Sequence, residues 1–94
     1  MKRFRYYFDR EINTTHVQKH AVSEEEIEEF FSEITIWTHK RKDDSLESIG
    51  KLKSGRYLTA IYRKLSKYDY FIITAFDIEE NYIKEFIEKE LSKL

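Results

Sequence analysis

The sequence predicts an α+β fold, in which helices pack against an antiparallel sheet in the order β-α-α-β-β-β-β-α. From residue 34 the hydrophobic pattern takes a period of two, and β-branched and aromatic residues fill residues 70–76, as is typical of strands. After Ser23 and after Asp77, apolar residues recur every three or four positions, as is typical of amphipathic helices. Because short connections join the four later strands, we expect them to pair antiparallel.

The N-terminal segment predicts one strand and one helix. Residues 2–8 place Phe4 and Phe8 on one face, as a half-buried strand requires. Asp9 is a suitable N-cap for a helix over residues 10–20, because its carboxylate can accept a backbone N–H of the first turn. The apolar content of this helix is small, so it would need a sheet beneath it.

The second helix has a clear start signal. Ser23 and Glu26 have the spacing of a capping box, in which each side chain satisfies a backbone amide of the other residue. The glutamates of the first turn also suit the positive end of the helix dipole. Ile27, Phe30 and Phe31 form the apolar face that this helix can bury.

The second half of the chain predicts a meander followed by a helix. Strands are expected at residues 34–39, 46–53, 56–64 and 70–76. Residues 40–45 form a charged loop, and Ser54-Gly55 is a credible two-residue hairpin turn. Asp77 and Glu80 have the spacing of a second capping box. The apolar stripe of the last helix comprises Ile78, Tyr82, Ile83, Phe86, Ile87, Leu91 and Leu94.

The composition predicts a single domain over residues 1–94, since 40% of the residues are hydrophobic and 37% are charged. No segment is apolar enough for a transmembrane helix or a secretion signal, so we expect a cytoplasmic protein without a membrane partner. The absence of cysteine excludes disulfides and cysteine–zinc sites. Two glycines are too few for a glycine-rich phosphate loop, and we expect no cofactor.

The net charge of −1 conceals four blocks of alternating sign. Residues 1–20 carry +3 and residues 39–67 carry +6, whereas residues 21–38 carry −6 and residues 68–94 carry −4. The acidic blocks coincide with the second and third predicted helices, and the basic blocks with the first strand, the first helix and the hairpin. One side of the protein should therefore be positive, with cations gathered on the sheet, as a phosphate-binding surface requires.

The strand at 56–64 interleaves cations with aromatic residues. Arginine grips phosphate with a bidentate fork, and a ring such as that of Tyr57 can stack on a base. The alternative is a solvated face, on which the cations aid solubility and the tyrosines are half-buried in the sheet.

Two histidines lie four residues apart in the predicted first helix. His16 and His20 could share a metal ion, but no third ligand is indicated, and we assign no metal ligand. His20 could instead act as a general acid or base, because imidazole titrates near neutral pH. The other alternative is a histidine packed against the sheet and bonded to a backbone carbonyl.

An ordered set of short motifs resembles the BrnT toxin family. The N-terminal half contains Phe8-Asp9, then Asn13, then Lys19-His20-Ala21-Val22-Ser23 before an acidic helix that ends in Phe30-Phe31. The C-terminal half contains Ile49-Gly50, Gly55-Arg56-x-Leu58 and Ile72-Ile73-Thr74-Ala75. The family has similar motifs in the same order, and the resemblance covers nearly the whole chain.

The resemblance implies a RelE-like ribonuclease fold that cuts RNA, inhibits translation and is silenced by an antitoxin protein. By motif it points to Lys19, His20 and Arg56. The charge pattern adds Tyr62, Arg63 and Lys64. In metal-independent cleavage of RNA, His20 or Tyr62 would move the proton, and the arginines or Lys64 would stabilise the phosphorane charge; Lys19, Arg56, Lys64 and Tyr57 would bind the RNA.

The sequence also departs from the family pattern. Ala21 replaces a glycine, Phe76 replaces an arginine, and Phe71 occupies a position that is usually basic. The loss of basic residues favours an alternative, a catalytically silent module that binds RNA or a protein. A third possibility is a protein-binding domain that uses its acidic helices.

Overall fold

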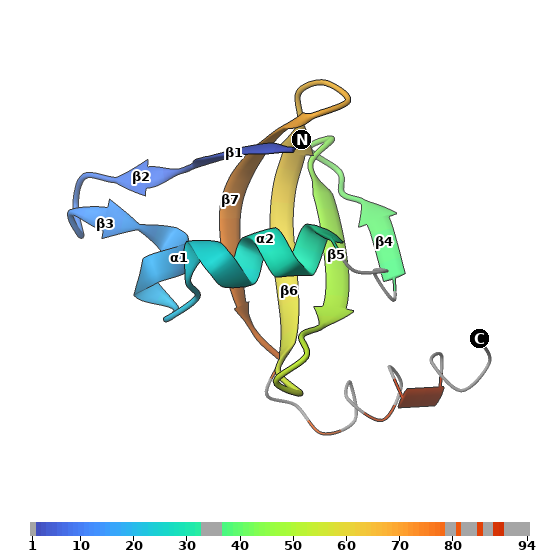
Figure 1. The fold of residues 1–94 in the computed structure, drawn as a ribbon. Coiled ribbons are helices and arrows are strands. Elements are labelled where there is room, and N and C mark those ends of the chain that lie inside the picture. The colour runs from blue at the N-terminus through green and yellow to red at the C-terminus, as the bar shows by residue number, and fades with distance from the viewer. Residues whose placement is uncertain (1, 33–36, 79–80, 82–84, 86–87, 90–94) are drawn as a thin grey trace.

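The computed structural model describes residues 2–32, 37–78, 81, 85, 88 and 89, which form a five-stranded sheet with helix α2 lying across one face (Figure 1). The strand order is β1-β7-β6-β5-β4. The elements are β1 (Arg3–Tyr6), α2 (Glu24–Ser32), β4 (Trp37–Lys40), β5 (Leu46–Lys51), β6 (Tyr57–Lys64) and β7 (Asp69–Asp77). The predicted α+β class is confirmed.

The four later strands form the predicted antiparallel meander, but β1 does not follow the prediction. It pairs parallel with β7, in the register Arg3 with Asp69 through Tyr6 with Ile72. Arg3 and Asp69 are 66 residues apart in sequence, so no tight turn forces an antiparallel pairing. The parallel register places Phe4 beside Tyr70 on the face that α2 covers, where both rings also contact each other.

The predicted helix over residues 10–20 is wrong. The chain instead forms a small antiparallel pair of strands, β2 (Phe8–Asp9) and β3 (Thr14–Thr15), followed by one turn of helix, α1 (His16–Lys19). The carboxylate of Asp9 accepts the backbone N–H of Glu11, only two residues away, so it closes a turn rather than capping a helix. Thr15 is the N-cap of α1 in its place, and its hydroxyl accepts a bond from the Gln18 amide.

The predicted capping box of the second helix is confirmed. Ser23 donates its backbone N–H to Glu26 Oε1 at 3.0 Å, and Glu26 donates its own N–H to Ser23 Oγ at 3.1 Å. The helix then buries Ile27, Phe30 and Phe31, as its spacing predicts.

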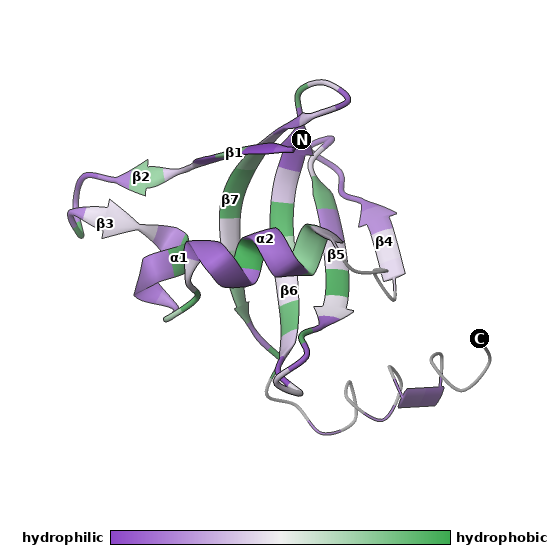
Figure 2. Ribbon diagram, in the orientation of Figure 1, coloured by the Kyte–Doolittle hydropathy of each residue, from purple (hydrophilic) through white to green (hydrophobic). Residues whose placement is uncertain are grey.

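The core lies between α2 and the sheet. Phe31 packs against Tyr62 and Tyr70 of the central strands, with ring centroids 4.8 and 5.1 Å apart. Phe30 lies so close to Gly50 that a Cβ added there would be 2.9 Å from its ring. Figure 2 shows hydrophobic bands on β5, β6 and β7 beneath the helix, whereas β1 is largely hydrophilic.

The turn between β5 and β6 is longer than the predicted two residues. β5 ends at Lys51 and β6 begins at Tyr57, and the backbone N–H of Leu52 donates to the Arg56 carbonyl across the turn. Gly55 has a φ of 93°, so it supplies the positive φ that the sequence predicts. The turn is longer because the Gly55 N–H closes onto the Leu52 carbonyl at 2.9 Å, which places three residues between Leu52 and Arg56.

Beyond β7 the described residues Asn81, Glu85, Glu88 and Lys89 are helical, and Ile78 is buried. The rest of the predicted stripe and the partner of Asp77 in its capping box lie outside the described residues, as do Ile34 and Ile36 of the predicted strand at 34–39. In the described part of the chain, no helix has the length and apolar character needed to cross a membrane.

Candidate functional site

The predicted site residues are divided between the two ends of β6. Arg56 precedes the first residue of the strand, whereas Arg63 and Lys64 form its last two positions. At about 3.3 Å per residue, seven positions separate Arg56 from Arg63 by about 23 Å. The three predicted charge-stabilising residues therefore cannot act together on one phosphate.

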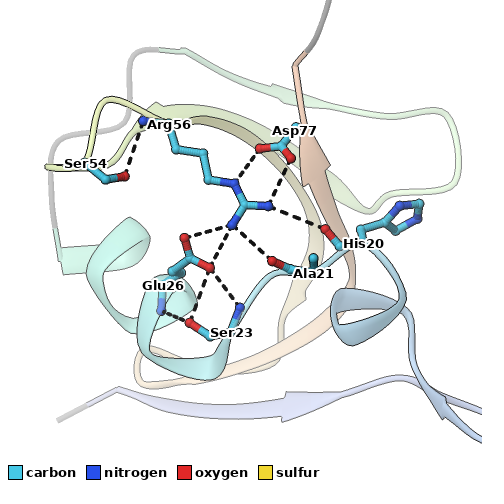
Figure 3. Close-up of polar contacts among 7 residues, drawn as sticks. All are labelled: His20, Ala21, Ser23, Glu26, Ser54, Arg56 and Asp77. Atoms are coloured by element: carbon cyan, nitrogen blue, oxygen red, sulfur yellow. Dashed lines mark hydrogen bonds and ion pairs between the residues drawn. The ribbon is translucent and has the colours of Figure 1, made fainter.

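Arg56 is held by groups from three segments of the chain (Figure 3). Its Nη1 donates to both carboxylate oxygens of Glu26 at 2.8 Å and to the Ala21 carbonyl at 3.1 Å. Its Nε and Nη2 donate to the carboxylate of Asp77, the latter at 3.0 Å, and Nη2 also faces the His20 carbonyl at 3.5 Å. The guanidinium thereby links the hairpin to three segments: the residues before α2, the first turn of α2 and the end of β7.

The electrostatics at Arg56 agree with this geometry. The hydrogen bond to Asp77 raises the pKa of Arg56 above its usual range, and the bond to Glu26 adds to it, against the opposing effect of burial. Burial alone would raise the pKa of Glu26, but the Ser23 amide and the Arg56 guanidinium outweigh it and the pKa lies below its usual value. A phosphate at Arg56 would have to compete with two carboxylates, so its role in RNA binding stays a prediction.

The tyrosines of β6 point into the molecule. Tyr62 is 7% exposed, and its hydroxyl is hydrogen-bonded to Ser48 Oγ at 2.8 Å, which in turn bonds Thr38 at 2.9 Å. Tyr57 is 8% exposed, and its hydroxyl donates to Glu88. Burial and then Glu88 raise the pKa of Tyr57. The structure thus gives both hydroxyls internal partners, and neither ring is presented to solvent for a base.

The Lys19-His20-Ala21-Val22 motif ends α1 with a Schellman turn. Val22 donates its amide to the Val17 carbonyl at 2.9 Å, and Ala21 donates to the Gln18 carbonyl at 3.0 Å. Ala21 has a φ of 58°, the left-handed conformation that glycine adopts most readily. The turn aims the His20 and Ala21 carbonyls at Arg56.

The side chains of Lys19 and His20 are exposed at the end of α1. In Figure 3 the His20 ring points away from the Arg56 cluster, and it lies 5.8 Å from the ring of Phe76. The structure therefore places His20 beside Arg56 through its backbone, while its imidazole faces another side.

His16 has a partner that sequence patterns did not predict. Its Nε2 lies 3.0 Å from Asp9 Oδ2, and its ring meets the edge of the Tyr7 ring at 5.0 Å. The hydrogen bond to His16, together with the Glu11 amide, lowers the pKa of Asp9. Only the turn between β2 and β3 brings these two residues together, so a helix prediction for this segment hides the pair. His16 and His20 have different neighbours, and the alternative of a shared metal ion finds no support in that arrangement.

Exposed cations gather at the end of the sheet where β6 and β4 finish. We call this surface the cationic end; it comprises Arg3, Lys40, Arg41, Lys42, Arg63, Lys64 and Lys67. The carboxylates in the same segments are Asp43, Asp44 and Asp69. Among the residues that the structure describes, three carboxylates cannot neutralise seven cations, so this end carries a positive excess. The cations lie over this end of the sheet and not over its middle as predicted, because the faces there carry largely apolar and aromatic side chains.

A row of side chains extends the cationic end across three strands. The register places Arg5 of β1 and Arg63 of β6 on either side of Phe71 in β7. Directly paired residues project from the same face of a sheet, so the ring is flanked by two guanidinium-bearing side chains. Both arginines are exposed and Phe71 is half-buried. Sequence reasoning missed Arg5, because only the pairing of β1 with β7 brings it here.

No protein-family model matches this chain, and the comparisons with curated proteins and with solved structures give no match either. What the protein does is therefore inferred from its own residues.

Proposed function

We propose that this chain binds RNA through the cationic end and that it cuts RNA as a BrnT-like toxin of RelE-like fold, held in check by an antitoxin protein. The observation that carries the proposal is the excess of seven exposed cations over three carboxylates at one end of the sheet. A nucleic-acid strand is a row of phosphates, and cations that neutralise it release counterions and gain affinity. The ordered BrnT-like motifs support RNA as the particular nucleic acid.

The row of Arg5, Phe71 and Arg63 suits a single strand. An unstacked base can lie on an aromatic ring, and guanidinium groups on both sides can hold the adjacent phosphates. Phe71 occupies a position that is usually basic in the BrnT family. The flanking strands β1 and β6 place a cation on each side of it.

Cleavage without a bound metal needs three things: a base for the 2′-hydroxyl, a cation for the phosphorane and a proton for the leaving oxygen. Arg63 and Lys64 are exposed and can meet the phosphate. The contacts of Arg56 and Tyr62 favour structural roles for these two residues.

Binding is tested by a titration of labelled single-stranded RNA, followed by fluorescence anisotropy at several salt concentrations. The double variant Arg5→Glu/Arg63→Glu should bind at least tenfold more weakly, and its salt slope should fall by about 0.7 for each phosphate that the variant no longer neutralises. Lys53→Glu is the matched control for either single variant, because it changes the charge by the same two units on the turn at the other end of β6. A wild-type affinity that does not respond to salt would contradict the proposal.

Cleavage is tested by expressing the chain without a partner protein. Growth should stop and cellular RNA should be cut, and co-expression of the antitoxin should restore growth. Unchanged growth together with intact RNA would contradict the proposed toxin activity.

A second candidate function is a catalytically silent module on the same fold. The observation that favours it is that Arg56 and Tyr62, two predicted catalytic residues, are engaged in internal hydrogen bonds. Salt-sensitive RNA binding without any cleavage would select this second function.

A further inference from the structure

We propose that His16 is the general base that cuts RNA and that Asp9 positions it, a proposal that rests on the RNA-cutting function proposed above. The two residues face each other across the small β2–β3 unit, with His16 Nε2 3.0 Å from Asp9 Oδ2. Their side chains are 29% exposed for His16 and 23% exposed for Asp9, so the pair is open to a substrate and partly shielded from water.

The contacts fix the orientation of the imidazole. Asp9 is held in turn, since its Oδ1 accepts the Glu11 amide at 2.9 Å. With a carboxylate at Nε2, the proton of the neutral ring lies on Nε2 and leaves Nδ1 as the proton acceptor. In the described part of the chain, Nδ1 has no hydrogen-bond partner. The Tyr7 ring packs perpendicular to the imidazole, with the ring centroids 5.0 Å apart, and this contact limits rotation of the imidazole.

The pair also lies on the path that the RNA would take. Arg3, Arg5 and Tyr7 alternate along the first strand and its continuation, so they project from one side of this edge of the sheet. All three are exposed. A strand of RNA that enters at the cationic end and crosses the row at Phe71 would therefore run along this edge to Tyr7, which touches His16.

The proposed step is a transfer within the RNA. His16 Nδ1 takes the proton of a 2′-hydroxyl, the 2′-oxygen forms a bond to phosphorus, and the bond from phosphorus to the 5′-oxygen breaks. The 5′-oxygen takes a proton from water, and His16 returns its proton to solvent. Asp9 is a positioning residue that stabilises the imidazolium. The other charged residues next to the pair in sequence are Lys19 on α1 and Arg10 and Glu11 in the turn.

The experiment measures RNA binding and single-turnover cleavage of the same oligonucleotide over pH 5 to 8. His16→Gln should lower the cleavage rate at least about a hundredfold, while the Kd for RNA changes less than about twofold. Asp9→Asn should lower the rate less than His16→Gln does and should give a pH profile that differs from that of the wild type, because the imidazole loses the carboxylate that positions it. The wild-type product should carry a 2′,3′-cyclic phosphate, and a 2′-deoxy substrate should not be cut.

His39→Gln is the matched control, because His39 is a second exposed imidazole beside a carboxylate, 3.8 Å from Glu47 on the β4 side of the sheet. It should leave the cleavage rate unchanged. If His16→Gln does not fold, the imidazole resonances of wild-type His16 are followed by NMR, and RNA should shift them.

The proposal for the pair would be overturned if His16→Gln cleaved RNA at the wild-type rate, or if RNA did not shift the His16 resonances. Either result would leave the proposed RNA binding intact. RNA that is bound but not cut would also overturn the proposal for the pair, and would select the silent module. Absence of salt-sensitive RNA binding by the wild-type chain would instead overturn the proposed function itself.

Discussion

Arg56 and Glu26 lie 2.8 Å apart, and both carboxylate oxygens of Glu26 accept from the same nitrogen, Nη1. Asp77 binds the opposite side of the guanidinium. Because Glu26 also completes the capping box of α2, one carboxylate connects the start of that helix with the hairpin. The ion pair therefore fixes where α2 begins relative to the sheet.

Replacement of Arg56 should destabilise the fold. Arg56→Ala removes charge-assisted bonds to two carboxylates and leaves Glu26 and Asp77 facing each other, at a cost of about 2–3 kcal/mol for a partly exposed cluster. Urea denaturation followed by circular dichroism measures the change. Arg63→Ala is the control, since its nearest carboxylate is 4.0 Å away, and it should cost less than about 0.5 kcal/mol. Equal destabilisation by the two variants would contradict the role assigned to Arg56.

The contribution of Glu26 should depend on pH. Its folded pKa lies below the usual value of 4.5, so its stabilisation is fully present above that value and is lost as the pH falls through the folded pKa. The difference in unfolding free energy between wild type and Glu26→Gln should be constant from pH 7 to about 5.5 and shrink below about 4.5. Urea denaturation at each pH measures it. A difference in unfolding free energy that grows as the pH falls would contradict this prediction.

Ala21→Gly should stabilise the protein. Ala21 has a φ of 58°, and an L-residue is strained there by about 1–2 kcal/mol, of which the greater chain entropy of glycine offsets part. The net gain should be about 0.5–1 kcal/mol. Thermal unfolding gives the measurement. A lower Tm for the glycine variant would contradict the left-handed conformation, and RNA binding should not change.

The variant Tyr62→Phe tests whether the Tyr62 hydroxyl has a structural or a catalytic role. The variant removes one buried hydrogen bond, but Ser48 keeps its bond to Thr38, so the decrease in stability should be about 1 kcal/mol. RNA cleavage should continue at the wild-type rate. A decrease in cleavage greater than tenfold in a folded variant would restore the catalytic role predicted from the sequence.

The local signals of the sequence succeeded where a short segment decides its own structure. The spacing of Ser23 and Glu26 predicted the start of α2, since a capping box is closed by residues three apart. The apolar positions Ile27, Phe30 and Phe31 predicted the buried face of that helix. The strands predicted at 46–53, 56–64 and 70–76 were correct with small errors at their ends, whereas the start of the strand predicted at 34–39 lies outside the described residues.

The same signals failed where one residue type suits two local structures. Asp9 can cap a helix or close a turn, and the chain took the turn because β2 and β3 pair and Asp9 binds His16 as well as Glu11. These contacts join residues two to seven positions apart, in a turn and a strand pair that helical spacing does not describe. The sequence therefore correctly predicted that Asp9 accepts a nearby backbone N–H, but it assigned that bond to a helix cap and not to a turn.

The sequence by itself determined the α+β class, the capping of α2, the antiparallel meander and the segregation of charge along the chain, because these depend on periodicity and on neighbours a few residues apart. Only the tertiary structure decided that Arg56 is held by two carboxylates, that Tyr62 is buried, that Arg5 lies beside Phe71 and that His16 faces Asp9. The physical reason is that the role of a side chain depends on the groups that folding places in contact with it. Strand pairing and turn geometry set those neighbours.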